Sequence, residues 1–230
     1  MTELRMRGLS YLLFFLPAAA LAAPPQRVAI QYEMSRNGSA MAEVSEILQH
    51  DGKNYSVSSE VQGKGIYALM GVLKRSSKGR IEATGLQSAE YRDQRGNRTP
   101  VVAKFDWAKR NIVQESDGRS ETLEMPAVLH DPLSMAYTYS FVPPSGREIR
   151  FSRADGKGFT PFRFVVVGTE KIKTPAGEMP ALHLSKERDG PEDKETDIWL
   201  ASERNFLPVR ILVVEKDGTR IDQIITRMGF

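Results

Sequence analysis

Glycine-containing turn dipeptides divide most of the chain into short segments, and this spacing constrains its fold more than any other feature. They are Asn37-Gly38, Asp51-Gly52, Asp117-Gly118, Asp155-Gly156, Asp189-Gly190 and Asp217-Gly218. Asn-Gly and Asp-Gly favour tight turns that need a positive φ angle, and between alternating segments they are a strong signal for β-hairpins. The sequence therefore predicts a series of consecutive antiparallel strands.

The segments between these turns alternate between apolar and polar residues. Val28, Ile30, Tyr32 and Met34, for example, fall on one face of the first segment. Such alternation is typical of antiparallel strands with one face in water. We expect strands over residues 27–36, 39–50, 53–62, 74–83, 87–95, 98–108, 111–116, 147–153, 159–170, 179–187, 195–200, 207–216 and 219–228. The predicted class is all-β, an antiparallel meander curled into an open barrel or two packed sheets, with one short helix.

Two segments interrupt the strand pattern. Asp131-Pro132 has the pattern of an N-cap followed by proline at the first helical position, so we predict a short helix over residues 132–141. Residues 63–73 are mostly apolar, begin at a glycine and show no clear period. This segment has three interpretations, which are a buried helical turn, a crossover and a mobile flap.

The first 22 residues have the pattern of a secretory signal peptide. Arg5 and Arg7 precede an apolar run, and Ala20-Leu21-Ala22 provides a small-residue cleavage site. The apolar run is shorter than the roughly 20 residues of a membrane-spanning helix, so an uncleaved anchor is the less favoured alternative. We expect cleavage near Ala22, which leaves residues 23–230 as a single exported β domain that is not an integral membrane protein.

Composition excludes several kinds of site. The chain has no cysteine, which excludes disulfides, thiolate metal sites and a cysteine nucleophile. A net charge of +3 is too small to indicate nucleic-acid binding. His50, His130 and His183 lack the spacing of metal ligands, and the helix start explains Ser134 and Asp131 better than a catalytic triad does. The sequence predicts no catalytic residue, metal or cofactor.

Several short motifs occur in an order that resembles a family of exported Gram-negative bacterial proteins classified only as a domain of unknown function. The strongest are Lys173-Thr174-Pro175-Ala176-Gly177-Glu178, Asp197-Ile198-Trp199-Leu200-Ala201 and Leu207-Pro208-Val209-Arg210-Ile211. The resemblance spans roughly residues 27–228. It implies a mostly antiparallel β structure in the periplasm and no established activity, so no catalytic residue is carried over.

A curled sheet of more than about eight strands encloses an interior that its own side chains do not easily fill. We therefore expect a non-enzymatic binding module for a lipid-like, apolar or amphipathic molecule of the cell envelope. The candidate ligand-binding residues are Ile66, Tyr67, Leu69, Met70, Leu133, Tyr137 and Trp199. For Trp199 the favoured interpretation is a core residue, because it adjoins Ile198 and Leu200 in an expected strand, and a ligand platform is the alternative.

Basic residues cluster on two neighbouring expected strands and form a candidate basic patch. They are Lys74, Arg75, Lys78, Arg80 and Arg92, with Arg95 and Arg98 beyond them. Such a patch would contact lipid phosphates or an acidic polymer, unless nearby Glu82, Glu90 and Asp93 balance it.

Two alternative functions stand beside the binding module. One is a structural or interaction module with a filled core, whose partner is another envelope protein. The other is an enzyme of unrecognised type.

Overall fold

The computed structural model describes residues 23–188 and 190–230. The signal-peptide prediction falls on residues 1–22, outside the described part, and so does Asp189 of one predicted turn. No helix within the described residues is long and apolar enough to cross a membrane.

The described residues form one 15-stranded sheet in the order β8-β7-β6-β5-β4-β3-β2-β1-β15-β14-β13-β12-β11-β10-β9. The strands are β1 (Arg27–Arg36), β2 (Ser39–His50), β3 (Asn54–Gly63), β4 (Leu73–Glu82), β5 (Gly85–Arg95), β6 (Val101–Asp106), β7 (Asn111–Ser116), β8 (Arg119–Glu124), β9 (Leu129–His130), β10 (Glu148–Ala154), β11 (Phe159–Thr174), β12 (Gly177–Lys186), β13 (Glu195–Ala201), β14 (Leu207–Val214) and β15 (Arg220–Gly229). Neighbours pair antiparallel except β9 and β10, which are parallel. The first and last strands, β1 and β15, pair in the middle of the sheet.

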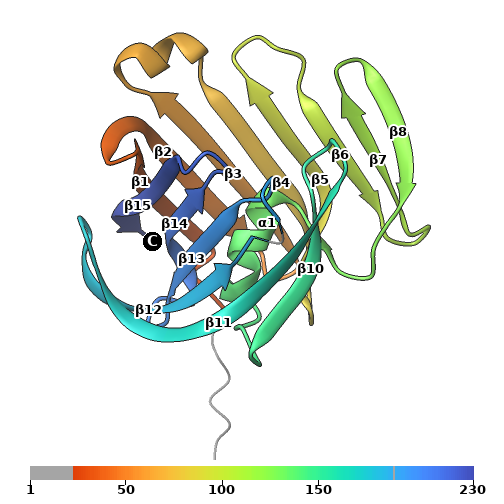
Figure 1. Cartoon of the computed structure of the whole chain (residues 1–230). Helices are drawn as coiled ribbons and strands as arrows, with labels where there is room; N and C mark the ends of the chain where they lie inside the picture. Colours follow the sequence, from red (N-terminus) through yellow and green to blue (C-terminus); the bar gives the residue numbers. More distant parts are fainter. Residues whose placement is uncertain (1–22, 189) are drawn as a thin grey trace, which may run out of the picture.

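The sheet is strongly curled, as Figure 1 shows, and its β9 end contacts β5. The turn between β10 and β11 lies against β6 and β7. At Gly156 in this turn, an added Cβ would lie 2.3 Å from Cγ1 of Val101, and Gln114 Nε2 donates to the Gly158 carbonyl at 3.4 Å. The strands from β5 through β1 and β15 to β9 thus form a ring, and β6 to β8 extend beyond it. Among the described residues the ring is closed by packing and not by strand pairing, so the predicted open barrel is confirmed.

A short helix lies inside the ring (Figure 1). Helix α1 (Pro132–Tyr137) continues into the 3₁₀ helix η2 (Thr138–Ser140), in agreement with the predicted helix. The Asp131 side chain accepts hydrogen bonds from the backbone N–H groups of Leu133 and Ser134, and Ser134 Oγ accepts one from Asp131 N–H. This capping box, with Pro132 at the first position, fixes where the helix begins.

Three elements differ from the sequence-based expectation. Strands β8 and β9 were not predicted. Residues 63–73 contain the 3₁₀ helix η1 (Gly65–Met70), which is helical as one interpretation held but not buried. Its Ile66 and Leu69 side chains are 76% and 90% exposed.

Candidate functional site

The ring encloses a cavity of about 700 Å³. Both halves of the sheet and α1 contribute to its lining. Its larger apolar side chains are Met34, Met41, Val61, Met70, Leu73, Leu133, Met135, Phe162, Ile211, Val213 and Ile221. Four of the chain's nine methionines are among them. Methionine is flexible and polarizable, so such a lining adapts to ligands of irregular shape.

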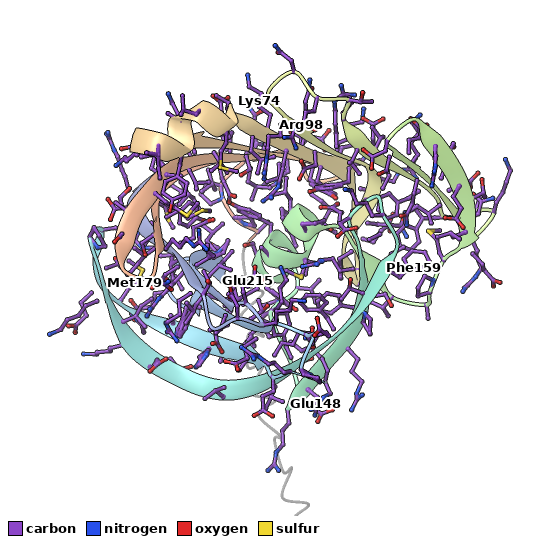
Figure 2. All side chains as sticks on the ribbon, turned by 45° about the horizontal axis from the view of Figure 1, so that its top comes forward. Lys74, Arg98, Glu148, Phe159, Met179 and Glu215 are labelled. Atoms are coloured by element: carbon purple, nitrogen blue, oxygen red, sulfur yellow. The ribbon has the colours of Figure 1, made fainter. Side chains whose placement is uncertain are left out.

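The cavity opens between η1 and the loop that joins β12 to β13. Exposed Gly71, next to η1, and exposed Glu192 and Lys194, in the loop, all belong to the lining. Tyr67 and Met70 of η1 lie at the same opening. Figure 2 shows side chains from both walls converging on the interior of the ring, with Lys74 and Arg98 along the wall that carries η1.

The floor of the cavity is α1, which is held to the β4 and β5 wall through Asp131. Ser77 Oγ and Ser88 Oγ each donate to Asp131 Oδ2 at 2.6 Å, in addition to the two backbone donors at the helix start. Tyr55 OH in turn lies 2.9 Å from Ser77 Oγ and donates to Ser88 Oγ at 3.1 Å. Because Asp131, Ser77 and Ser88 are buried, this network fixes the position of the floor.

A buried carboxyl group, Glu46 on β2, also lines the cavity. It accepts hydrogen bonds from Ser59 Oγ at 2.9 Å and from Tyr137 OH at 2.6 Å. Burial raises the pKa of Glu46, although both hydrogen bonds and Arg75 act in the opposite direction. This favours the neutral acid, which suits an apolar surrounding. Glu46 was not among the residues predicted from the sequence, although alternation along β2 places it on the inward face with Val44 and Leu48.

Three basic side chains from separate strands line another part of the cavity. Arg75 on β4 donates from Nε to Asp93 Oδ2 at 2.9 Å. The guanidinium of Arg153 on β10 lies 4.7 Å from the centroid of the Phe162 ring, and Lys186 Nζ on β12 lies 5.4 Å from the same centroid. The sequence analysis placed only Arg75 in a candidate site.

Four of the predicted ligand-binding residues line the cavity, namely Tyr67, Met70, Leu133 and Tyr137. Ile66 and Leu69 point into solvent beside the opening and are not part of its lining. The structure thus places residues of both predicted segments, η1 and α1, in the lining of one cavity.

Trp199 lies apart from the cavity. Thr196 lines the cavity, and Trp199 lies three positions further along β13. Side chains an odd number of positions apart on a strand point to opposite faces, so Trp199 lies on the face away from the cavity. There the indole stacks on His183 at 4.4 Å between centroids, donates to Glu170 Oε1 at 2.6 Å and lies beneath the Arg210 guanidinium. This position agrees with the interpretation of Trp199 as a packing residue.

The predicted basic patch is divided by the sheet. Arg75 points inward, whereas Lys74 and Lys78 point outward and pair with Glu60 at 3.6 Å and Glu90 at 3.2 Å. Arg80 and Arg92 are exposed, and Arg92 donates to Gln94 at 3.4 Å. The outer face therefore carries a mixture of both charges, as the alternative interpretation holds. Arg95, at the end of β5, lines the cavity.

The chain is similar to solved structures and matches one protein family. The β-barrel-like protein of domain of unknown function DUF1849 from Brucella abortus is similar, with a TM-score of 0.59, 10% identity, and coverage of 90% of this chain and 98% of that chain. A candidate lipoprotein from Parabacteroides distasonis has a TM-score of 0.37 and 10% identity, covering 91% and 96% of the two chains. No curated protein matches the sequence. The family model for the protein of unknown function DUF3108 matches residues 29–225, and the chain therefore belongs to the DUF3108 family.

Proposed function

We propose that this protein is an exported, periplasmic binding module that holds an apolar or amphipathic molecule of the cell envelope inside its ring. The observation that carries the proposal is the interior cavity of about 700 Å³ with its methionine-rich lining. That volume lies within the range of roughly 300–1,000 Å³ found for small-molecule sites. A protein whose interior only stabilised the fold would pack it closely.

The construction of the ring supports uptake of a ligand. Its last contact, between β9 and β5, has no ladder of backbone hydrogen bonds, so the ring is not a closed barrel of paired strands. Hydrogen bonds from Ser77 and Ser88 to Asp131 hold this junction, which leaves the opening beside η1 as the entrance. The opening beside η1 gives a bulky molecule an entrance, because η1 has no buried residue that anchors it.

The location is supported by the sequence alone. Residues 1–22 have the charged start, apolar run and small-residue site of a secretory leader. The likeness to the DUF1849 structure, at 10% identity, supports the fold alone.

The test is to export the full chain with its own leader and purify it without detergent. Native mass spectrometry should then show a bound organic mass, and the emptied protein should take up the fluorescent probe N-phenyl-1-naphthylamine. Ala42→Phe, at a buried position in the cavity wall, should reduce probe uptake severalfold. Ala40→Phe, at an exposed position on the same strand, is the matched control.

A urea midpoint for each variant separates lost binding from lost folding. Protein that is repeatedly empty and takes up no probe would overturn the proposal and leave the interaction-module alternative.

A further inference from the structure

Three of the basic side chains that line the cavity, Arg75, Arg153 and Lys186, lie in the same part of it. Arg153 and Lys186 both lie beside the Phe162 ring, at 4.7 Å and 5.4 Å from its centroid. Burial lowers the pKa of the Arg153 guanidinium, and the neighbouring positive charge of Arg75 adds to this effect. Cations gathered in a half-buried place repel one another, so each needs a counter-charge.

Two of these cations have their counter-charge within the protein. Arg75 is paired with Asp93 at 2.9 Å. Lys186 forms an ion pair with Asp193 and also donates to the backbone carbonyl of Lys194 at 3.1 Å. Neither therefore requires a ligand.

Arg153 is less well satisfied. Across residues 23–188 and 190–230 it forms only a long ion pair, with Asp155 at 4.0 Å. Its Nε is buried and has no hydrogen-bond partner among the described residues. A buried cationic donor without an acceptor is energetically unfavourable, and an acceptor supplied by a ligand would remove that cost.

The other unsatisfied group in the lining points to the same ligand chemistry. Within the described part of the chain, the buried and unpartnered polar atoms on cavity-lining side chains are Arg153 Nε and Gln223 Nε2, and both are N–H donors. The ligand must therefore bring acceptors. The planar guanidinium fork matches the two oxygens of a carboxylate or phosphate.

The acidic side chains of the lining do not oppose an anion. At the opening, Asp193 is paired with Lys186, Glu215 with Lys194 and Glu192 with Lys216. The remaining acid, Glu46, lies among hydrogen-bond donors on the wall next to α1, and its raised pKa favours the neutral form.

We infer that the cavity selects an amphipathic molecule with an anionic oxygen head group, carboxylate or phosphate, which Arg153 binds while the apolar tail lies along the methionine-rich lining. This inference rests on the proposed function and adds the chemical class of the ligand.

The test is displacement of N-phenyl-1-naphthylamine from the full exported protein by four single-chain amphiphiles: hexadecanoic acid, hexadecyl phosphate, hexadecanol and hexadecylamine. We expect the acid or the phosphate to compete about tenfold better than the alcohol, as one charge-assisted hydrogen bond to a half-buried guanidinium would produce. The amine should compete worst. The better of the two anions identifies the head group.

Arg153→Gln should abolish this preference while probe uptake persists, and Arg153→Lys should retain part of it. Arg150→Gln is the matched control, because Arg150 lies on the same strand, is exposed and pairs with Glu148 outside the cavity. Equal competition by acid and alcohol in the unmodified protein would overturn the inference, and so would an unchanged preference in Arg153→Gln. Failure to take up the probe at all would instead overturn the proposed function.

Discussion

Tyr137 on α1 donates a hydrogen bond of 2.6 Å to Glu46 on β2, across 91 residues of sequence. Both groups are buried, and Ser59 donates to the other carboxyl oxygen of Glu46. This contact joins the floor of the cavity to its wall. It also places the acid where it affects both the stability of the fold and the polarity of the interior.

Tyr137→Phe removes this donor and leaves one oxygen of Glu46 unsatisfied in the interior. We expect a loss of about 2 kcal/mol in the free energy of unfolding, measured by urea denaturation. Tyr67→Phe is the control, since Tyr67 is only half-buried and lies at the cavity opening. Equal effects of the two substitutions would contradict the structural role given to Tyr137.

Glu46 also predicts a pH dependence. In the unfolded chain its carboxyl ionises near the ordinary pKa of 4.5, whereas burial raises the pKa in the folded state. Between those two values the folded protein keeps a proton that the unfolded chain has lost. The contribution of Glu46 to stability is therefore largest below pH 4.5 and falls as the pH rises through its raised pKa.

Glu46→Gln lacks this titration. The free energy of unfolding of the variant, minus that of the unmodified protein, should increase as the pH rises above 4.5. Denaturation curves from pH 4 to pH 8 would measure it. Glu43→Gln, at an exposed position on the same strand, is the matched control for the substitution itself. A flat profile for Glu46→Gln would show that the folded protein does not hold the extra proton.

Asp131→Ala should be among the most destabilising single substitutions. It removes a helix N-cap, worth about 1 kcal/mol, and leaves the buried hydroxyls of Ser77 and Ser88 without their acceptor. We expect a total loss of about 3 kcal/mol or more in urea denaturation. Ser134→Ala, which removes the reciprocal half of the capping box and a 3.1 Å hydrogen bond with Ser88 Oγ but keeps the Asp131 acceptor, should cost about 1 kcal/mol. If Asp131→Ala costs less than Ser134→Ala, the hydrogen bonds of Asp131 do not hold the floor helix and apolar packing does.

Trp199→Phe tests the assignment of this residue to the far face of the sheet. The substitution loses the hydrogen bond to Glu170 and weakens the contact with Arg210, so unfolding should become easier by about 1–2 kcal/mol. Uptake of N-phenyl-1-naphthylamine should remain unchanged. Reduced probe affinity in a folded variant would place Trp199 in the binding site after all.

The strands were predictable wherever one face is apolar, because alternation is a local signal. Strand β8 carries no such signal: all of its residues except half-buried Leu123 are exposed, and its neighbour β7 supplies the apolar face. Strand β9 has only two residues. The curling that brings β9 to β5 depends on contacts distant in sequence, which no local pattern contains.

The candidate site was predictable in its apolar part and not in its polar part. Leu133 and Tyr137 follow from a helix that has to be buried, and Met70 from an apolar run between glycines. Glu46 and Arg153 share inward faces with Leu48 and Phe151. The groups that bind an inward-facing charged side chain lie on other elements of the fold, and the sequence does not show which they are. Sequence alternation alone assigns charged residues to solvent, and this is why both were missed.

The pairing of β1 with β15 has a consequence for how the molecule assembles. Strand β1 lacks one of its two neighbours until β15 has been synthesised. Removing β15 would therefore split the sheet at its middle and leave two unprotected edges there, each able to recruit a foreign strand. Pairing between strands so distant in sequence forms slowly, and until it forms these edges are open to aggregation.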